Sequence, residues 1–161
     1  ENLMGQEGDG FKQALKNLDG GRISIAAFSL GMAQGILDEC LRFMRTPEGA
    51  PMARSQAVQF EVAAMATETE AARLLVYRCA DMKDRKIPYS KESAMAKLYA
   101  SETASRNGMR GLQVMGQAGL TRKFAVERLT RDAKLAEIGE GTSEVQRLVI
   151  SRALGMGGKD A

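Results

Sequence analysis

Apolar residues recur along most of this chain at alternating steps of four and three, the spacing of a helix that buries one face. The repeat predicts one long helix over 22–45 and a second over 53–86. Their seams are Ala26, Leu30, Ala33, Leu37, Cys40 and Met44, and Val58, Val62, Met65, Thr69, Ala72, Val76 and Cys79. A third helix is predicted over 91–115, with a seam of Ala94, Leu98, Ser101, Ser105, Gly108, Leu112 and Met115. We interpret all three seams as core. The small third seam indicates a close helix approach, or a face that meets something other than hydrocarbon.

Proline and glycine mark where these helices end. TPEGAP and KIPYS interrupt the pattern after the first and second helices, and Ser90 offers a start for the third. Two shorter helices are predicted over 123–136 and 143–154, separated by a glycine motif, and the last carries Val145, Leu148, Val149 and Arg152 in step. The chain therefore predicts an all-α protein, an antiparallel up-and-down four-helix bundle over 11–155 whose fourth helix is broken. Residues 1–10 are predicted to be a linker and 156–161 a tail.

Charge and histidine content exclude several classes of function. The 23 basic and 20 acidic side chains nearly balance, no polybasic block occurs, and aromatic residues make up 5% of the chain, which argues against nucleic acid as a partner. Histidine is absent, which rules out His-based metal sites and Ser–His–Asp or Cys–His catalysis. Proton chemistry would have to come from a carboxylate or a less usual group.

The two cysteines and the apolar runs bear on the protein's cellular compartment and not on a catalytic reaction. Cys40 and Cys79 fall on apolar seams near opposite ends of the predicted bundle, so we expect two buried free thiols and no disulfide. Such thiols fit a reducing compartment. No apolar run approaches the length of a membrane span.

Glu140 stands between Gly139 and Gly141 just before the last helix. Bare backbone on both sides suits the close passage of a bulky group beside a carboxylate, whereas the simpler alternative is a turn with a solvated acid. Asp19-Gly20-Gly21-Arg22 is predicted to open the first long helix, with Asp19 as its N-cap. The cluster from Glu127 to Asp132 has the spacing of an ion-paired surface.

Taken in order, these motifs carry a family resemblance. The stretches GDGFKQALKNLDGGR, QAVQFEVAAMATETEAARLLVY, MAKLYASETA, ERLTRDAK and EGTSEVQRLVISRAL resemble the C-terminal domain of the acyl-CoA dehydrogenase family over nearly the whole chain. The resemblance implies an FAD-dependent enzyme that introduces an α,β double bond into an acyl-CoA thioester. It also implies that Glu140 is the base that removes the α-proton. A minority of members carry the base directly before the arginine that matches Arg22, where this chain has Gly21.

Further roles follow from the same resemblance. It implies substrate contacts by Asp19, Arg22 and Gly141, and contacts to the same subunit's FAD by Thr142, Ser143 and Glu144. It implies that a second set reaches the FAD of a neighbouring subunit: Arg45, Ser55, Gln56, Gln113 and Gln117. A homodimer or homotetramer, an electron-transfer flavoprotein as acceptor, and a cytoplasmic or mitochondrial-matrix location are implied as well.

Three positions depart from the family pattern. Glu48 replaces an aromatic residue near the FAD, and Gly116-Gln117 replaces a Gly-Gly pair, which weakens the expected contact with the neighbour's adenine. Gly139 replaces a tyrosine and opens the acyl end of the channel, which fits a substrate other than a plain short straight chain, but many bacterial-type members of the family share this change, so it does not select one substrate. The acyl group and the electron acceptor stay open at this point.

The family's N-terminal helical domain and middle β-domain are not in this sequence, so we expect a piece of a longer enzyme, inactive by itself. Two other classes of function are alternatives. One is a related acyl-CoA oxidase or nitroalkane-oxidising flavoprotein, although the latter uses aspartate where this chain has Glu140. The other is a non-catalytic helical module that only assembles or associates with DNA.

Overall fold

The computed structural model describes residues 3–156, and this part of the chain is helical with no strand. The elements are α1 (Gly10–Met44), α2 (Ala50–Ala53), α3 (Gln56–Asp84), α4 (Ser90–Met115), the 3₁₀ helix η1 (Gly116–Leu120), α5 (Val126–Ile138) and α6 (Ser143–Ala153). Each predicted helix is present, and the all-α prediction is confirmed. The predicted tail lies outside the described residues except for Met156, as do the first two residues of the predicted linker.

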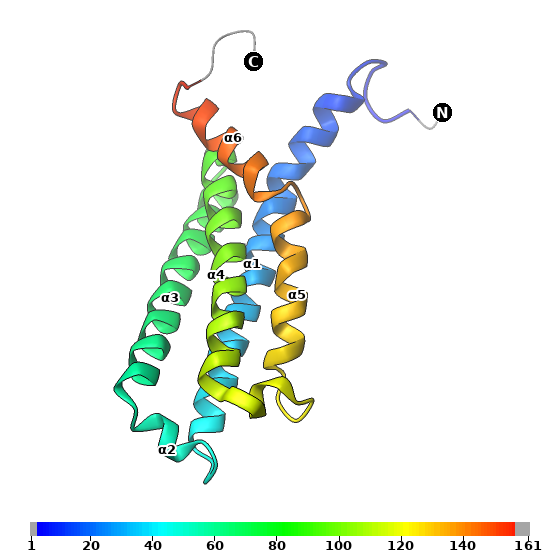
Figure 1. Cartoon of the computed structure of the whole chain (residues 1–161). Coiled ribbons are helices and arrows are strands. Elements are labelled where there is room, and N and C mark those ends of the chain that lie inside the picture. Colours follow the sequence, from blue (N-terminus) through cyan, green and yellow to red (C-terminus); the bar gives the residue numbers. More distant parts are fainter. Residues whose placement is uncertain (1–2, 157–161) are drawn as a thin grey trace.

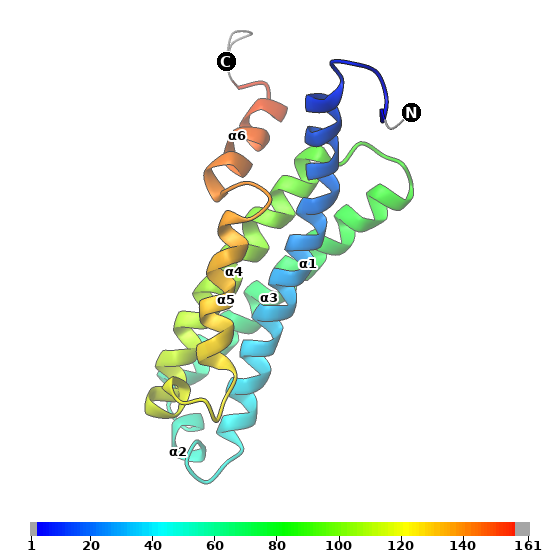
Figure 2. The same cartoon turned by 90° about the vertical axis from the view of Figure 1, so that its right-hand side faces the viewer.

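Helices α1, α3, α4 and α5 form the predicted antiparallel four-helix bundle (Figure 1). Successive helices run in opposite directions, α2 closes one end, and α6 packs against α4 at the other end (Figure 2). The most extensive contact joins α1 and α4, which run in the same direction, and α3 and α5 flank this central pair.

Small side chains on α4 explain the close central pair. Its fully buried residues include Ala94, Ala96, Ala100 and Ala104. A methyl group at Gly111 would lie 2.9 Å from Cγ2 of Ile36 in α1 and 3.1 Å from Cγ1 of Val126 in α5. The close approach predicted from the third seam is therefore confirmed.

Both cysteines are buried and free, as predicted. Cys40 packs with Phe43 and Met65 toward the α2 end, whereas Cys79 packs with Val76 in a separate cluster. Burial raises the pKa of Cys40 to about 12, with a smaller contribution from the charge of Glu39. Burial likewise raises the pKa of Cys79 to about 11. Both thiols therefore stay protonated and serve as packing groups.

The predicted start of the first helix is wrong. Helix α1 begins at Gly10, and Asp19 lies inside it instead of capping it. The Asp19 carboxylate accepts hydrogen bonds from Arg22, at 2.5 Å, and from the hydroxyl of Ser90 in α4, at 3.0 Å. Because these bonds link Asp19 to its own helix and to α4, the Gly20-Gly21 pair continues the helix.

The apolar stripe of the last helix faces outward. Val145 and Leu148 are 40% and 53% exposed, and the buried residues of α6 are Ser143 and Gln146. Helix α6 therefore rests on the bundle partly through these two polar side chains, which both lie in its first turn.

Candidate active site

Glu140 lies in the turn between α5 and α6 with a left-handed backbone, at φ +55°. A non-glycine residue held in this region costs about 1–3 kcal/mol and is frequent at functional sites. Gly141 is also left-handed, at φ +93°, and a methyl group there would lie 2.9 Å from Nε2 of Gln146. Gly139 is ordinary extended backbone, with φ −63° and ψ 148°. The turn therefore requires glycine at 141, whereas Gly139 is not required by backbone conformation.

The carboxylate of Glu140 lies directly against the bare backbone of Gly21 in α1. A methyl group at Gly21 would lie 2.6 Å from Cδ of Glu140 and 3.0 Å from its Oε1. Arg22 is buried beside this contact, and its Nε has no hydrogen-bond partner within the described residues. Helix α1 thus brings Asp19 and Arg22 to the same end of the bundle as Glu140 and Gly141, as the substrate set predicts.

The start of α6 is held by its own side chains. The hydroxyl of Thr142 accepts a hydrogen bond from the backbone N–H of Val145 at 3.4 Å and caps the helix. The pKa of Glu144 is lowered, first by its own backbone N–H and then by the Thr142 hydroxyl. Ser143 is buried, and its hydroxyl has no partner among the residues described.

Two buried side chains that the sequence did not single out hold this turn. Lys97 of α4 donates from Nζ to the carbonyl oxygen of Gly141 at 2.8 Å and to that of Glu137 at 3.1 Å. Gln146 of α6 donates from Nε2 to the carbonyl oxygens of Gly141 at 2.9 Å and Glu140 at 3.1 Å. A signal was available for Lys97, because it falls three residues after Ala94 and four before Ser101, on the buried seam of its helix.

The second predicted set lies at the opposite end of the bundle. Arg45 follows the last residue of α1, Ser55 and Gln56 begin α3, and Gln113 and Gln117 lie around the end of α4. All five side chains are exposed. The 26 residues of α4 span about 39 Å at 1.5 Å per residue, so the two sets do not form one pocket.

One observation of this structure is consistent with a cofactor bound at the end of the bundle that carries Glu140. The buried Ser143 hydroxyl is an unsatisfied polar group at a helix start, and a ligand covering the turn could satisfy it. At the other end of the bundle, Glu48 occupies the position at which the resembled family has an aromatic residue. Its carboxylate oxygen lies 4.0 Å from Nζ of Lys123, and both side chains are largely exposed.

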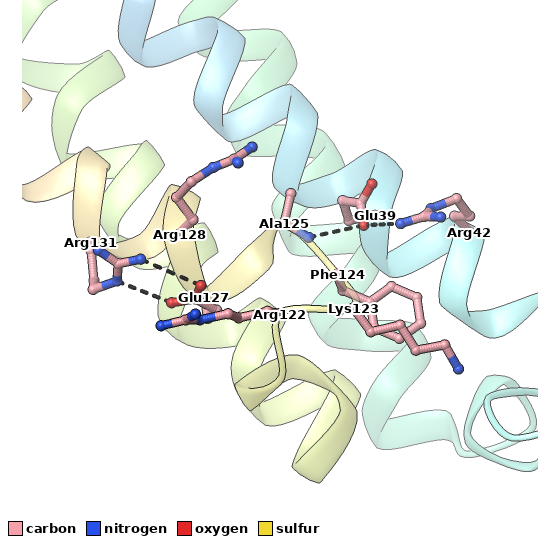
Figure 3. A pocket seen from close by; sticks show the side chains of 9 residues that line it. All are labelled: Glu39, Arg42, Arg122, Lys123, Phe124, Ala125, Glu127, Arg128 and Arg131. Atoms are coloured by element: carbon pink, nitrogen blue, oxygen red, sulfur yellow. Dashed lines mark hydrogen bonds and ion pairs between the residues drawn. The ribbon is translucent and has the colours of Figure 1, made fainter.

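A basic pocket lies between α1 and α5 (Figure 3), and it shares Lys123 and Phe124 with an adjacent pocket that Gln117 lines. Its lining is Glu39, Arg42, Arg122, Lys123, Phe124, Ala125, Glu127, Arg128 and Arg131. Arg131 pairs with Glu127 at 3.0 Å, and Arg42 pairs with Glu39 at 2.5 Å. The predicted ion-paired surface around Glu127 is confirmed, and these two pairs offset two of the five basic side chains that line the pocket.

Two classes of feature were not found in residues 3–156. None of the helices that the structure describes combines the length and apolarity needed to cross a bilayer. No group of three or more Cys, Asp or Glu side chains in this part of the chain is placed to hold a metal ion.

The sequence was compared with known proteins. The family model described as "Acyl-CoA dehydrogenase, C-terminal domain" matches residues 8–155. The chain is 50% identical over 155 residues to the probable acyl-CoA dehydrogenase YngJ of Bacillus subtilis, covering 95% of this chain and 41% of that protein. It is 49% identical over 153 residues to the mitochondrial short-chain specific acyl-CoA dehydrogenase of Mus musculus, covering 94% of this chain and 37% of that protein.

Among solved structures, butyryl-CoA dehydrogenase from Megasphaera elsdenii superimposes with a TM-score of 0.90 at 41% identity. The match covers 95% of this chain and 40% of that one. The chain thus spans about two fifths of the length of the proteins it resembles.

Proposed function

The chain belongs to the acyl-CoA dehydrogenase family, and from this premise we propose that it is the C-terminal domain of an FAD-dependent acyl-CoA dehydrogenase with Glu140 as its base. The observation that carries the proposal is the placement of the Glu140 carboxylate against Gly21, beside the buried Arg22. Because position 21 has no side chain, α1 offers no rival carboxylate there.

In the proposed reaction, the carboxylate of Glu140 takes the α-proton of the acyl-CoA. The backbone N–H of Glu140 donates to the thioester carbonyl, which makes that proton more acidic. Arg22 and Asp19 line the substrate channel, and the glycine at 141 lets the substrate approach the backbone.

FAD is the cofactor we assign, and when bound it would accept the hydride that leaves the β-carbon. Thr142, Ser143 and Glu144 would contact the same subunit's FAD. Arg45, Ser55, Gln56, Gln113 and Gln117 would contact the FAD of a neighbour in a homodimer or homotetramer. An arginine with several amide side chains suits a pyrophosphate group.

For the substrate, we propose a short acyl group of about the length of butyryl-CoA, in place of the departure from a short straight chain that Gly139 alone had favoured. The support is that two similar proteins are a short-chain specific acyl-CoA dehydrogenase and a butyryl-CoA dehydrogenase. An electron-transfer flavoprotein is the proposed acceptor, and the cytoplasm of a bacterium or the mitochondrial matrix the proposed location, both from the family resemblance.

Replacement of the base tests the proposal. In the protein expressed from its full reading frame, Glu140→Gln should retain bound flavin but lose butyryl-CoA turnover by about 10²–10⁴-fold or more, because proton transfer loses its acceptor. Anaerobic bleaching of the flavin by butyryl-CoA measures the reductive half-reaction, a dye that reoxidises the flavin is added to measure turnover, and octanoyl-CoA tests the chain length. Glu127→Gln, which removes a partly buried ion-paired carboxylate of α5, is the control and should turn over normally. Unchanged turnover in Glu140→Gln would remove Glu140 as the base.

A further inference from the structure

The turn that carries Glu140 is held by donors from two other parts of the bundle. Lys97 reaches from α4 to the carbonyl oxygens of Glu137 and Gly141, on either side of Glu140. Gln146 reaches back from α6 to the carbonyl oxygens of Glu140 and Gly141. Gly141 therefore accepts from both side chains. We call Lys97 and Gln146 the carbonyl clamp.

Lys97 is an unusual residue to find without solvent contact. Its side chain is fully buried, and burial lowers the pKa of its ammonium group, opposed mainly by the charge of Glu137. Lysine is rarely buried unless it is partnered. Its partners here are the carbonyl of Gly141 in the turn and that of Glu137 in the last turn of α5, which contains no basic residue of its own. A cation there is favoured by the helix dipole and by the free carbonyl groups.

The carbonyl clamp holds a backbone conformation that costs free energy. Glu140 is left-handed without being glycine, and the only other described residue of this kind is Lys86, in the α3–α4 loop. Such a conformation persists when the surroundings determine it. The direction of the Glu140 side chain follows from this backbone, and it ends against Gly21.

We propose that Lys97 and Gln146 are positioning residues that fix the backbone of 140–141 and so aim the Glu140 carboxylate at the substrate. Neither residue needs to touch substrate or flavin, because each acts through the carbonyl oxygens of the turn. The inference rests on the proposed function, since it assigns the clamp a role in proton removal by Glu140.

The test uses the full-length holoenzyme with two independent variants, Lys97→Met and Gln146→Leu. Each should bind flavin and unfold cooperatively, yet lower kcat for butyryl-CoA by about 10- to 100-fold with little change in KM, because the base is misplaced. Amide hydrogen exchange in the peptide that contains residues 139–142 should become faster in both variants. Lys134→Met removes an exposed lysine that pairs with the side chain of Glu137 and should change neither readout.

A double variant, Lys97→Met with Glu140→Gln, shows whether the clamp acts by positioning the base or by stabilising the fold. If the clamp acts through the base, then adding Lys97→Met to Glu140→Gln should cause no further loss of turnover. A further 10-fold loss in that background, or wild-type kcat in both single variants, would overturn the proposal. Loss of cooperative unfolding in both variants would also overturn it, because the pair would then hold the fold and not the base.

Failure of the underlying function gives a different result. A wild-type holoenzyme that butyryl-CoA and octanoyl-CoA leave unbleached, or full turnover in Glu140→Gln, would count against the dehydrogenase assignment or the base. The exchange measurement still decides whether the clamp holds the turn: unchanged exchange in both variants refutes it.

Discussion

Gly21 and Glu140 share one small volume, although they come from helix α1 and the α5–α6 turn. The carboxylate occupies the space that a Cβ at position 21 would fill, so the absence of a side chain in α1 decides where the acid can rest. A neighbouring glycine, Gly20, has no such role, since the nearest atom to a methyl group there is Nζ of Lys83 at 3.7 Å.

This pair of glycines gives a matched test. Both lie within α1, so Gly20→Ala and Gly21→Ala should each stabilise the helix by about 1 kcal/mol. Only Gly21→Ala pushes the carboxylate away, and we expect it to lower kcat for butyryl-CoA by about 10²-fold. Thermal unfolding and turnover of the two full-length variants check this. Equal turnover in both would mean that the carboxylate works from another position.

The sequence could identify the acid but not the groups that hold it. Glu140, Asp19 and Arg22 stand in recognisable motifs, and the structure places them at one end of the bundle. Lys97 and Gln146 bond to backbone carbonyls, which every residue carries, so no residue pattern marks the partner. A lysine is ordinarily solvated, so the register of Lys97 with the buried seam of its helix was a signal, but the three-dimensional packing is needed to show that this lysine is buried.

At the scale of the helices, the hydrophobic periodicity predicted which segments are helical, whereas the glycine pair led to a wrong start for α1. The seams of the first three predicted helices are mostly buried, because a repeat of four and three follows one face of an α-helix. The start of α1 was misplaced because Gly20-Gly21 has the composition of a helix boundary. Packing against α4 and the bonds of Asp19 carry the helix through these glycines.

The α1–α4 contact predicts opposite outcomes for two other glycines. In Gly111→Ala the methyl group meets Ile36 and Val126, and overpacking costs about 1–3 kcal/mol. This exceeds or cancels the gain of about 1 kcal/mol in helix propensity, so we expect net destabilisation of about 1 kcal/mol. Gly31→Ala in α1 has no atom within 4 Å of the added methyl and should stabilise by about 1 kcal/mol. Urea unfolding measures both, and a stabilised Gly111→Ala would show that the central pair is looser than described.

At the scale of the whole molecule, the two predicted site sets lie at opposite ends of one bundle (Figure 1). Under the proposed function, each chain therefore supplies the base to one flavin and an arginine to another. The sequence could name both sets from the family motifs. Their separation depends on the packing direction of the helices, which becomes certain only in the folded bundle.

Subunit complementation tests this division. Glu140→Gln and Arg45→Ala should each be impaired as homo-oligomers of the full-length protein. In a co-expressed hetero-oligomer, one site should combine an intact Glu140 with an intact Arg45 from the other chain, and activity should return to about half per pair. If Arg45 serves its own chain's flavin, every site keeps one defect. Mixed assemblies purified with two different tags should then show no recovery.

The contact between Gly21 and Glu140 also limits how such a catalyst can change over generations. An acid at position 21 and an acid at position 140 would claim the same space, so a lineage cannot accumulate both and later discard one without disturbing the fold at that point. Relocation of the base to α1 must begin with the loss of Glu140 or coincide with it. If the loss comes first, the route passes through a protein without a base, and if the two changes coincide, two substitutions are needed at once.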